Sequence, residues 1–260
     1  MADRIDRAWR TLATAFCFAV FGAGGLLLRV LVFPLLSLMP WSRATAQRIS
    51  RDVIHYALRF FVWLMHALGV IRCEVRNADR LRRNGLLIVA NHPSLIDAVF
   101  LMALTRGADC VVKGALAHHP VTRGTVLATG WIRNDAGGAA MVDDCIASLR
   151  GGGNVIIFPE GTRTRPGEPP QLQRGAANVA VRGGFDLTPV VIRCEPPTLT
   201  KGEKWYRVPE RQPRFVIDVH PDVRVARWVP DEGLEAVQAV RRLNHSLSDF
   251  FSREIRREGA

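Results

Sequence analysis

The chain has 260 residues, 48% of them hydrophobic, and a formal net charge of +11 at pH 7. This length suits one large α/β domain, or one domain with an appendage, and it allows a substantial buried core. The positive charge favours anionic partners, although charge that only keeps an Arg-rich chain soluble is an alternative explanation. The sequence has no zinc-finger spacing, no basic helix and no interleaved aromatic and basic residues, which argues against nucleic-acid binding.

The five cysteines are scattered singly along the chain and form no CxxC pair: Cys17, Cys73, Cys110, Cys145 and Cys194. The sequence therefore predicts neither a metal site nor a redox pair, and an odd, dispersed set suits a reducing compartment.

An uncharged run covers residues 11–28, and after Arg29 a second apolar run covers residues 30–39, with Pro34 inside it. The first run reaches the lower limit of length for a helix that crosses a hydrocarbon core of about 30 Å. The segment is expected either to span a bilayer or to enter and leave the same face with a bend at Pro34. Three arginines precede it and predict a cytoplasmic N-terminus: Arg4, Arg7 and Arg10.

A signal peptide is a competing interpretation, because the start is basic and residues 44–46 (ATA) resemble a cleavage site. The apolar stretch is too long for a signal peptide, however, and the candidate site lies far beyond its end, so we expect no removal. A buried helix of a soluble protein is the other alternative.

Residues 41–70 predict an amphipathic helix with basic residues between its apolar positions. The apolar residues at helical spacing are Ile49, Val53, Ala57, Phe60, Phe61, Leu64 and Leu68. Such a helix either packs on the domain as a covering helix or lies in a membrane interface. Residues 1–70 are therefore expected to form a membrane-anchoring unit of hydrophobic and amphipathic helices.

From residue 71 to residue 260 the pattern is that of an α/β domain. Strands are expected at residues 72–76, 85–90, 110–112, 154–158, 188–193 and 215–220, and helices at 94–105, 140–149, 175–182 and 231–257. This alternation predicts a mixed, largely parallel sheet covered by helices on both faces. One apolar stripe marks the last helix: Leu234, Val237, Val240, Leu243, Leu247 and Phe250.

The first polar cluster, residues 91–97 (NHPSLID), follows an apolar strand and opens an apolar helix. Ligand sites of α/β folds lie at strand ends of this kind. The Asp97 carboxylate can accept a hydrogen bond from the His92 imidazole and leave the other ring nitrogen free to take a proton. Helix capping by Ser94 and Asp97 is the structural alternative.

The second polar cluster, residues 158–165 (FPEGTRTR), also follows an apolar strand. Gly161 permits close approach of the backbone, Thr162 offers a hydroxyl and Arg163 offers a planar fork, which together suit an anionic head group such as phosphate. Glu160 is suited to orienting an arginine or binding a substrate hydroxyl. A polar turn with a local salt bridge is the alternative.

The two clusters together resemble the NHxxxxD (HX4D) and FPEGTR motifs of one family. That family is the 1-acyl-sn-glycerol-3-phosphate (lysophosphatidic acid) acyltransferases and related glycerolipid acyltransferases. Both motifs are complete here, in the same order, and the resemblance spans roughly residues 70–195.

The resemblance implies that His92 is the general base and Asp97 its orienting partner, and that an acceptor hydroxyl attacks the thioester of acyl-CoA or acyl-carrier protein directly. It further implies that Glu160, Gly161, Thr162 and Arg163 form the acceptor phosphate and glycerol site. Pro189 matches a proline in a later family block, and Lys113 and Pro120 resemble further common positions. Because a thioester is already activated, we expect no metal and no other cofactor.

One family block departs from the usual Gly-x-x-Phe-Ile-x-Arg pattern. Here the chain reads GWIRND from Gly130, so Arg133 stands in a shifted register. The departure leaves open another acceptor, such as a lyso-ornithine lipid. A thioester or lipid hydrolase and a non-catalytic lipid-binding membrane protein remain alternatives, although the sequence has no GxSxG elbow.

The preferred hypothesis is a phospholipid-biosynthetic O-acyltransferase, anchored through its N-terminus at the cytoplasmic face of the inner or plasma membrane. Its expected partners are membrane lipids and the acyl donor. The sequence does not specify an oligomeric state.

Overall fold

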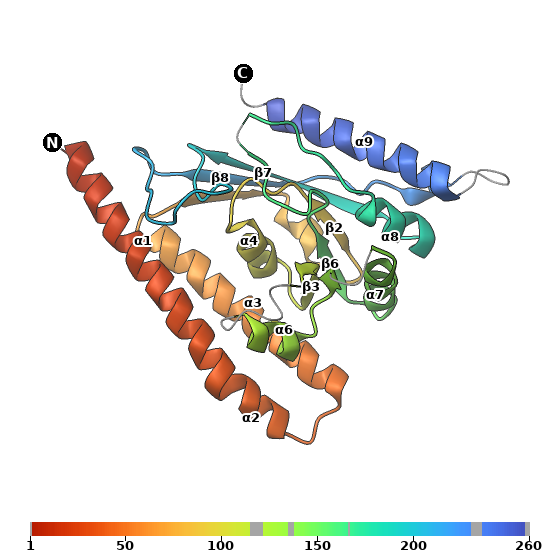
Figure 1. Ribbon diagram of the computed structural model, residues 1–260, viewed down its shortest axis with the longest axis horizontal. Helices are drawn as coiled ribbons and strands as arrows, with labels where there is room; N and C mark the ends of the chain where they lie inside the picture. The colour runs from red at the N-terminus through yellow and green to blue at the C-terminus, as the bar shows by residue number, and fades with distance from the viewer. Residues whose placement is uncertain (1, 115–121, 135–137, 166, 230–235, 258–260) are drawn as a thin grey trace.

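The computed structural model describes residues 2–114, 122–134, 138–165, 167–229 and 236–257 (Figure 1). Its centre is a six-stranded sheet in the order β1-β8-β7-β2-β6-β3. The strands are β1 (Arg72–Arg76), β2 (Leu87–Ala90), β3 (Ala108–Cys110), β6 (Asn154–Ile157), β7 (Leu187–Glu195) and β8 (Arg214–Val219). All neighbouring strands pair in parallel except β7 and β8, so the prediction of a mixed, largely parallel sheet is confirmed.

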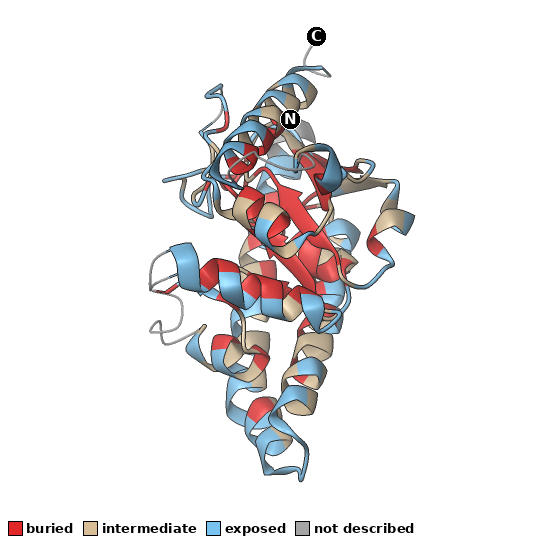
Figure 2. Ribbon diagram, turned by 90° about the vertical axis from the view of Figure 1, so that its right-hand side faces the viewer, coloured by how far each residue is buried: buried red, intermediate tan, exposed pale blue. Residues whose placement is uncertain are grey.

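Helices cover both faces of the sheet, as the sequence predicts. On one side lie α1 (Ala2–Leu27), α3 (Arg43–Ala67), α4 (Asp97–Leu104) and α6 (Arg123–Thr129); on the other lie α7 (Gly138–Arg150), α8 (Gly175–Gly183) and α9 (Ala236–Arg256). Alternation along β2 explains the two layers, because Ile88 and Ala90 join the core on the α3 side while Leu87 and Val89 join the core on the α8 side. All four residues are fully buried, and buried residues fill the centre of the molecule (Figure 2).

Short elements complete the fold. They are the 3₁₀ helices η2 (Ala78–Leu81) and η3 (Val225–Arg227) and a two-stranded sheet of β4 (Val112–Lys113) and β5 (Arg133–Asn134). The predicted strand at 110–112 is therefore divided, because β3 ends at Cys110 and Val112 pairs with Arg133 in β5.

The N-terminal helix continues through Pro34, where a bend was one of the two alternatives that the sequence left open. The π-helical segment η1 (Leu28–Val32) joins α1 to α2 (Phe33–Leu38) without a break in helical backbone. Pro34 lies in the first turn of α2, directly after the π-helical segment. The chain reverses after Leu38, and Ser42 caps α3 by accepting a hydrogen bond from the Thr45 backbone N–H.

A buried arginine fastens α1 to the rest of the protein. The side chain of Arg10 is 1% exposed, and its guanidinium donates to the carbonyls of Pro209 and Glu210 and to the carboxylate of Asp6. Ala13 and Cys17, on the same helix face, belong to the core that contains the sheet. A cleavable leader has no need of such packing, so the structure argues against the signal-peptide alternative.

The outer face of the same helix is apolar and exposed. Residues Ile5–Leu38 form one helix that is long and apolar enough to cross a membrane, with a mean hydropathy of 2.2 and only 11% of the most apolar window buried. Its large exposed side chains are Ile5, Trp9, Leu12, Phe16, Phe21, Leu26, Leu27, Val30, Leu31, Leu35 and Leu38. An exposed apolar surface of this extent marks an interaction site with a membrane or another protein.

The predicted apolar stripe of α3 is displaced by about one residue around the helix, although it includes the buried Phe61. The residues that are buried are Ser50, Ile54, His55, Leu58, Phe61 and Met65, whereas Phe60 is 53% exposed. Apolar residues surround most of this helix, so periodicity alone did not select the buried face. Arg51 on the inner side fixes the orientation, since it pairs with the Asp109 carboxylate at 2.9 Å and donates to the Thr129 carbonyl. Burial raises the pKa of Asp109 to about 6.

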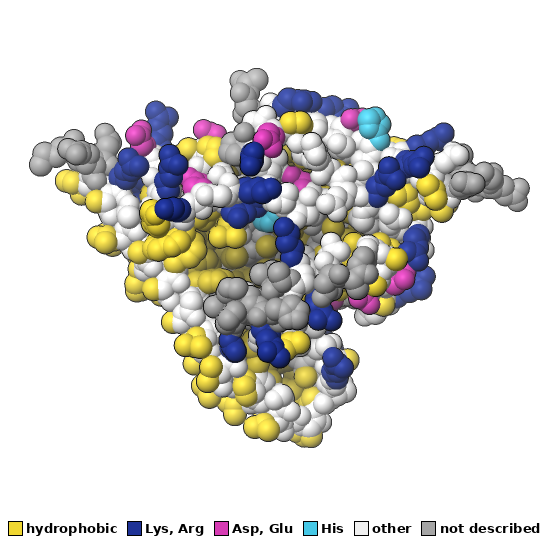
Figure 3. All heavy atoms as spheres, in the orientation of Figure 1, with side chains coloured by type: hydrophobic (Ala, Val, Ile, Leu, Met, Phe, Trp, Pro, Cys, Tyr) yellow, Lys and Arg dark blue, Asp and Glu magenta, His cyan; other side chains and the backbone are white. Residues whose placement is uncertain are grey.

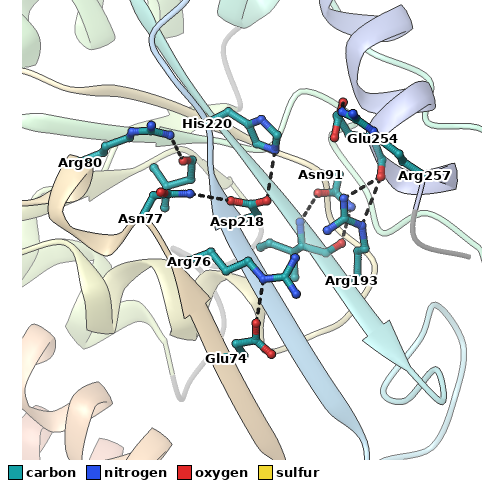
Figure 4. Close-up of polar contacts among 12 residues, drawn as sticks. Glu74, Arg76, Asn77, Arg80, Asn91, Arg193, Asp218, His220, Glu254 and Arg257 are labelled. Carbon is teal, nitrogen blue, oxygen red and sulfur yellow. Dashed lines mark hydrogen bonds and ion pairs between the residues drawn. The ribbon is translucent and has the colours of Figure 1, made fainter.

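The stripe predicted for the last helix is partly wrong. Val237 is 54% exposed, and the buried residues of α9 are Ala239, Val240, Leu243, Leu247 and Phe251. Leu234 and the predicted helix start at residue 231 lie outside the described residues. The end of the helix is held by Arg193 of β7, whose guanidinium donates to the Glu254 carbonyl (Figure 4).

Replacing Arg10 by alanine is expected to lower the free energy of unfolding by about 3 kcal/mol, because the buried guanidinium makes three hydrogen bonds, to two backbone carbonyls and to Asp6, that are all lost. Urea unfolding of the full chain in detergent micelles measures the change. Arg59→Ala, at an exposed position of α3, is the matched control and should change stability little. Equal stability of Arg10→Ala and the control would contradict the anchoring role of Arg10.

Candidate active site

The two polar clusters lie together because their strands are neighbours. Strands β2 and β6 pair in parallel, with Val89 opposite Ile157, so the turns that follow them emerge at the same sheet edge. The Glu160 carboxylate accepts a hydrogen bond from the backbone N–H of His92 at 2.9 Å. The Thr164 backbone N–H donates to the His92 carbonyl at 3.0 Å, so the second turn holds the first from both sides.

His92 and Asp97 form a hydrogen-bonded pair. The His92 Nδ1 lies 2.8 Å from the Asp97 Oδ2. Asp97 is the first residue of α4, and the same oxygen accepts a hydrogen bond from the Ser94 backbone N–H at 2.6 Å. A carboxylate acceptor at Nδ1 places the ring proton there, so Nε2 is the basic nitrogen of the neutral imidazole.

The electrostatics of the pair are set by burial. Asp97 is fully buried, which raises the pKa of its carboxyl, while the hydrogen bond from His92 and the charge of Arg163 act in the opposite direction. Within the described residues, the Asp97 Oδ1 has no hydrogen-bond partner. Burial also raises the pKa of Glu160, opposed by the backbone N–H of His92.

The imidazole is held in place by an aromatic neighbour. The ring of Phe158 stacks on the His92 ring with centroids 4.3 Å apart and an interplanar angle of 27°. The His92 side chain keeps 18% of its surface exposed. The ring is therefore fixed on two sides and still accessible to a ligand.

Asn91 attaches this turn to the next strand of the sheet. Its side-chain amide donates to the Ile192 carbonyl at 2.8 Å and accepts from the Ile192 backbone N–H at 2.7 Å (Figure 4). It thereby extends the pairing of β2 with β7 beyond the last residue of β2. No role for Asn91 was predicted from the sequence, although its position directly before His92, at the end of a predicted strand, marks it as a residue that could fix the turn.

Arg163 is engaged with the protein backbone. Its Nη1 donates to the carbonyls of Leu199 and Thr200, both at 2.9 Å. The same segment accepts hydrogen bonds from the Leu95 backbone N–H and the Ser94 hydroxyl, the latter through the Thr198 carbonyl. The segment 198–200 therefore forms one wall of the site, which sequence reasoning missed because it is distant in sequence from both motifs.

The remaining predicted site residues lie in different surroundings. Gly161 has a φ of +64°, and a Cβ atom there would lie 3.0 Å from the Gln173 Nε2, so the tight turn requires glycine. Thr162 is partly buried in the same turn. Lys113 is exposed on β4, and Arg133 is exposed on β5. Strand β4 follows β3 in the chain and lies beyond the sheet edge that carries the two polar turns.

Pro189 is not brought to this cluster. It is buried within β7, opposite Val89 of β2, and has no exposed surface to offer to a substrate. Pro120 lies outside the described residues.

A cavity of about 660 Å³ adjoins the turn that carries His92. Its lining includes both sequence neighbours of the histidine, Asn91 and Pro93, together with Thr164 and Arg193. This volume is within the usual range for a small-molecule site. In the part of the chain that the structure describes, no group of three His, Cys, Asp or Glu side chains is arranged to hold a metal ion.

Comparison with known proteins identifies the domain that carries this site. Residues 72–193 match the family model described as Acyltransferase. This stretch, a little under half of the chain, is similar to an acyltransferase domain. Both polar turns, and therefore the His92–Asp97 pair, lie within the matched residues.

Relatives of the chain come from bacteria and animals. It is 28% identical over 148 residues to the 1-acyl-sn-glycerol-3-phosphate acyltransferase of Pseudomonas aeruginosa, covering 54% of this chain and 56% of that protein. It is 29% identical over 221 residues to the 1-acyl-sn-glycerol-3-phosphate acyltransferase alpha of Homo sapiens, and the alignment covers 78% of this chain and 71% of the human protein. The chain thus spans little more than half the length of the bacterial relative.

The fold of the chain is similar to that of a solved structure. The crystal structure of the 1-acyl-sn-glycerophosphate acyltransferase PlsC from Thermotoga maritima superimposes with a TM-score of 0.70, over 99% of this chain and 98% of that chain. At 20% sequence identity, this similarity concerns the fold alone.

Replacing Arg163 by alanine is expected to loosen the wall at residues 198–200, because two charge-assisted hydrogen bonds are lost. Amide hydrogen exchange at Leu95 and in this segment should accelerate by about tenfold. Arg165→Ala is the matched control, since that exposed side chain has only a 3.8 Å contact with Glu168. Unchanged exchange in Arg163→Ala would show that the segment is held by other contacts.

Proposed function

We propose that this acyltransferase moves a fatty acyl group from acyl-CoA or acyl-carrier protein to the hydroxyl of a lysophosphatidic-acid-like acceptor, in phospholipid biosynthesis. The observation that carries the proposal is the hydrogen bond between the His92 Nδ1 and the buried Asp97. It orients an accessible imidazole as a base at the end of a parallel strand. The relatives are named 1-acyl-sn-glycerol-3-phosphate acyltransferases, which supports the acceptor class.

The proposed reaction begins with proton transfer from the acceptor hydroxyl to the His92 Nε2. The hydroxyl oxygen forms a bond with the thioester carbonyl carbon, and the tetrahedral intermediate collapses as the carbon–sulfur bond breaks. The proton then passes from His92 to the departing thiolate, which leaves as a thiol. Asp97 holds the ring and stabilises the transient imidazolium, so the chain needs no covalent acyl-enzyme.

The acceptor phosphate and glycerol are proposed to bind at the turn of Glu160, Gly161, Thr162 and Arg163. The Glu160 carboxylate holds the His92 backbone, so its main contribution is to position the base. The Arg163 Nη1 donates to the carbonyls of Leu199 and Thr200. The N–H groups on Nε and Nη2 of the same guanidinium are proposed to bind the anion. Lys113 and Arg133 are proposed to add positive charge at the same sheet edge.

We propose that no metal ion and no redox cofactor take part. The thioester supplies the activation that the reaction needs, and the His92–Asp97 pair supplies the base. The acyl donor is therefore a co-substrate and not a resident group.

We propose that residues 1–70 anchor the protein to the cytoplasmic face of the inner or plasma membrane and that residues 71–260 form the acyltransferase domain. The exposed apolar face of α1 and α2 supports this assignment. A lipid acceptor that remains in the bilayer requires an enzyme at the membrane surface.

Replacing His92 by alanine is expected to lower kcat by about 10²–10⁴-fold, because the acceptor hydroxyl loses its base. The assay uses labelled acyl-CoA and acyl-carrier protein with lysophosphatidic acid, glycerol phosphate and lyso-ornithine lipid as acceptors. His245→Ala, at an exposed position on α9, is the matched control and should keep wild-type activity.

Full activity in His92→Ala would overturn the proposal. Acyl transfer to the lyso-ornithine lipid but not to lysophosphatidic acid would show that the acceptor is an ornithine lipid and not a glycerophosphate. Release of free fatty acid without any acceptor would identify a hydrolase, and lipid binding without turnover would identify a non-catalytic protein.

Replacing Asp97 by asparagine is expected to reduce kcat by about 10²–10⁴-fold with little change in KM, because the amide no longer fixes the tautomer of His92. The fold should persist, since the substitution is close to isosteric and removes a buried charge; thermal unfolding monitors this. Asp79→Asn, at an exposed position, is the control. A change in KM alone would assign Asp97 to substrate binding instead.

A further inference from the structure

A second cavity lies far from the His92–Asp97 pair in sequence, at the N-terminal end of α1. It has a volume of about 440 Å³, and its basic lining residues are Arg7, Lys204 and Arg207. Two consecutive turns shape the loop opposite α1, through hydrogen bonds from the Glu203 backbone N–H to the Thr200 carbonyl and from the Arg207 backbone N–H to the Lys204 carbonyl. The cavity therefore combines a helix side chain with a structured loop.

The positive charge of this cavity is only weakly neutralised. Glu203 also lines it, but one of its carboxylate oxygens accepts from both the backbone N–H and the hydroxyl of Thr200. Arg7 has one distant ion pair, 3.9 Å from an exposed Glu210. Among the described residues, no carboxylate lies within ion-pair distance of the exposed Lys204 or Arg207, so the cavity favours an anion.

Two aromatic residues lie between the cations Lys204 and Arg207 in the loop, and Tyr206 lines the cavity. Trp205 is 43% exposed and Tyr206 is 51% exposed, and the Lys204 ammonium lies 5.6 Å from the centre of the Tyr206 ring. Trp205 also packs on Phe18 of α1, with ring centroids 5.3 Å apart. Tryptophan and tyrosine beside Lys and Arg are typical of the layer where lipid head groups meet hydrocarbon.

The cavity lies on one flank of the exposed side of α1, where Arg7 and Thr11 line it. Trp9, Leu12 and Phe16 are exposed on the helix turns that follow Arg7. Figure 3 shows hydrophobic side chains along the edge of the molecule that α1 forms, with Lys and Arg side chains gathered near its upper end. A helix that lies with its apolar face in a membrane interface keeps its flanks near the level of the head groups, and the cavity lies on such a flank.

We propose that this cavity binds the phosphate of an anionic phospholipid head group at the surface of a bilayer. Arg7, Lys204 and Arg207 neutralise the phosphate, and Trp205 and Tyr206 lie in the head-group layer. The helix α1, with its continuation through α2, then lies along the membrane surface, since the apolar face extends over the whole of Ile5–Leu38. This site lies outside the proposed catalytic pair and does not depend on the proposed reaction.

The loop that lines this cavity also reaches the candidate active site. Thr200, whose N–H and hydroxyl bind Glu203, is one of the two residues whose carbonyls accept from Arg163. A head group that fixes the 200–207 loop thus also supports the wall at residues 198–200. Membrane binding and the arrangement of the site share one short segment of backbone.

The test compares the double variant Lys204→Ala/Arg207→Ala with Arg241→Ala/Arg242→Ala, which removes the same charge from exposed positions on α9. Flotation with vesicles of phosphatidylcholine, with or without an equal share of phosphatidylglycerol, measures binding of the full chain. Loss of two cations near an anionic surface should weaken binding to the mixed vesicles by about 30-fold. The control should bind as the wild type does, and binding of all three proteins to pure phosphatidylcholine should be alike.

Equal losses in the two double variants would overturn the site in favour of general charge attraction. Release of the wild type from mixed vesicles by inorganic phosphate at constant ionic strength would also overturn it, since the cavity would then prefer a free anion. Quenching by brominated phosphatidylglycerol should decrease in Trp205→Phe relative to the wild type. Unchanged quenching would place Trp205 away from the lipid. None of these measurements requires turnover, so they remain valid if the proposed reaction fails.

Discussion

Parallel pairing of β2 with β6 and β7 is the constraint on which the site depends. Because the carboxyl ends of these strands share one edge, the turns after Ala90 and Ile157 come into direct contact although nearly seventy residues separate them. Each contact reinforces another: Glu160 holds the His92 backbone, Asn91 extends the pairing to β7, and Asp97 closes the helix turn onto the ring. The imidazole is thus oriented by backbone geometry, and the proposed role of His92 as a base depends on this preorganisation.

The hydrophobic helix is part of the folded body and not a detachable tether. Arg10 buries its charge against two backbone carbonyls, while the opposite side of the same helix exposes leucine and phenylalanine. One helix therefore belongs to the core on one face and presents an apolar surface on the other. The 198–210 segment links both functions, since it accepts hydrogen bonds from Arg163 and from Arg10. A membrane that contacts α1 lies next to the backbone that walls the candidate site.

Several residue roles differ from the sequence-based hypotheses for identifiable reasons. Glu160 was expected to meet an arginine or a substrate, but its nearest donor is the His92 backbone, which only the pairing of β2 with β6 brings into reach. Arg163 was assigned to a phosphate, and part of its fork is occupied by the distant segment 199–200. Pro189 is buried in a central strand. In α3 and α9 the periodicity was correct, yet apolar residues beyond the buried stripe, such as Phe60 and Val237, misplaced its edges.

The sequence by itself determined the alternation of strands and helices, the mixed sheet, the two polar turns and the pairing of His92 with Asp97, because each of these depends on residues close together in the chain. The resemblance to glycerolipid acyltransferases came from the same local motifs. Only the tertiary structure decided which face of α3 is buried, that Arg10 anchors α1, and that residues 198–200 wall the site. Those features depend on contacts between segments distant in sequence, where the partner is selected by packing and by the need of buried polar groups for hydrogen bonds.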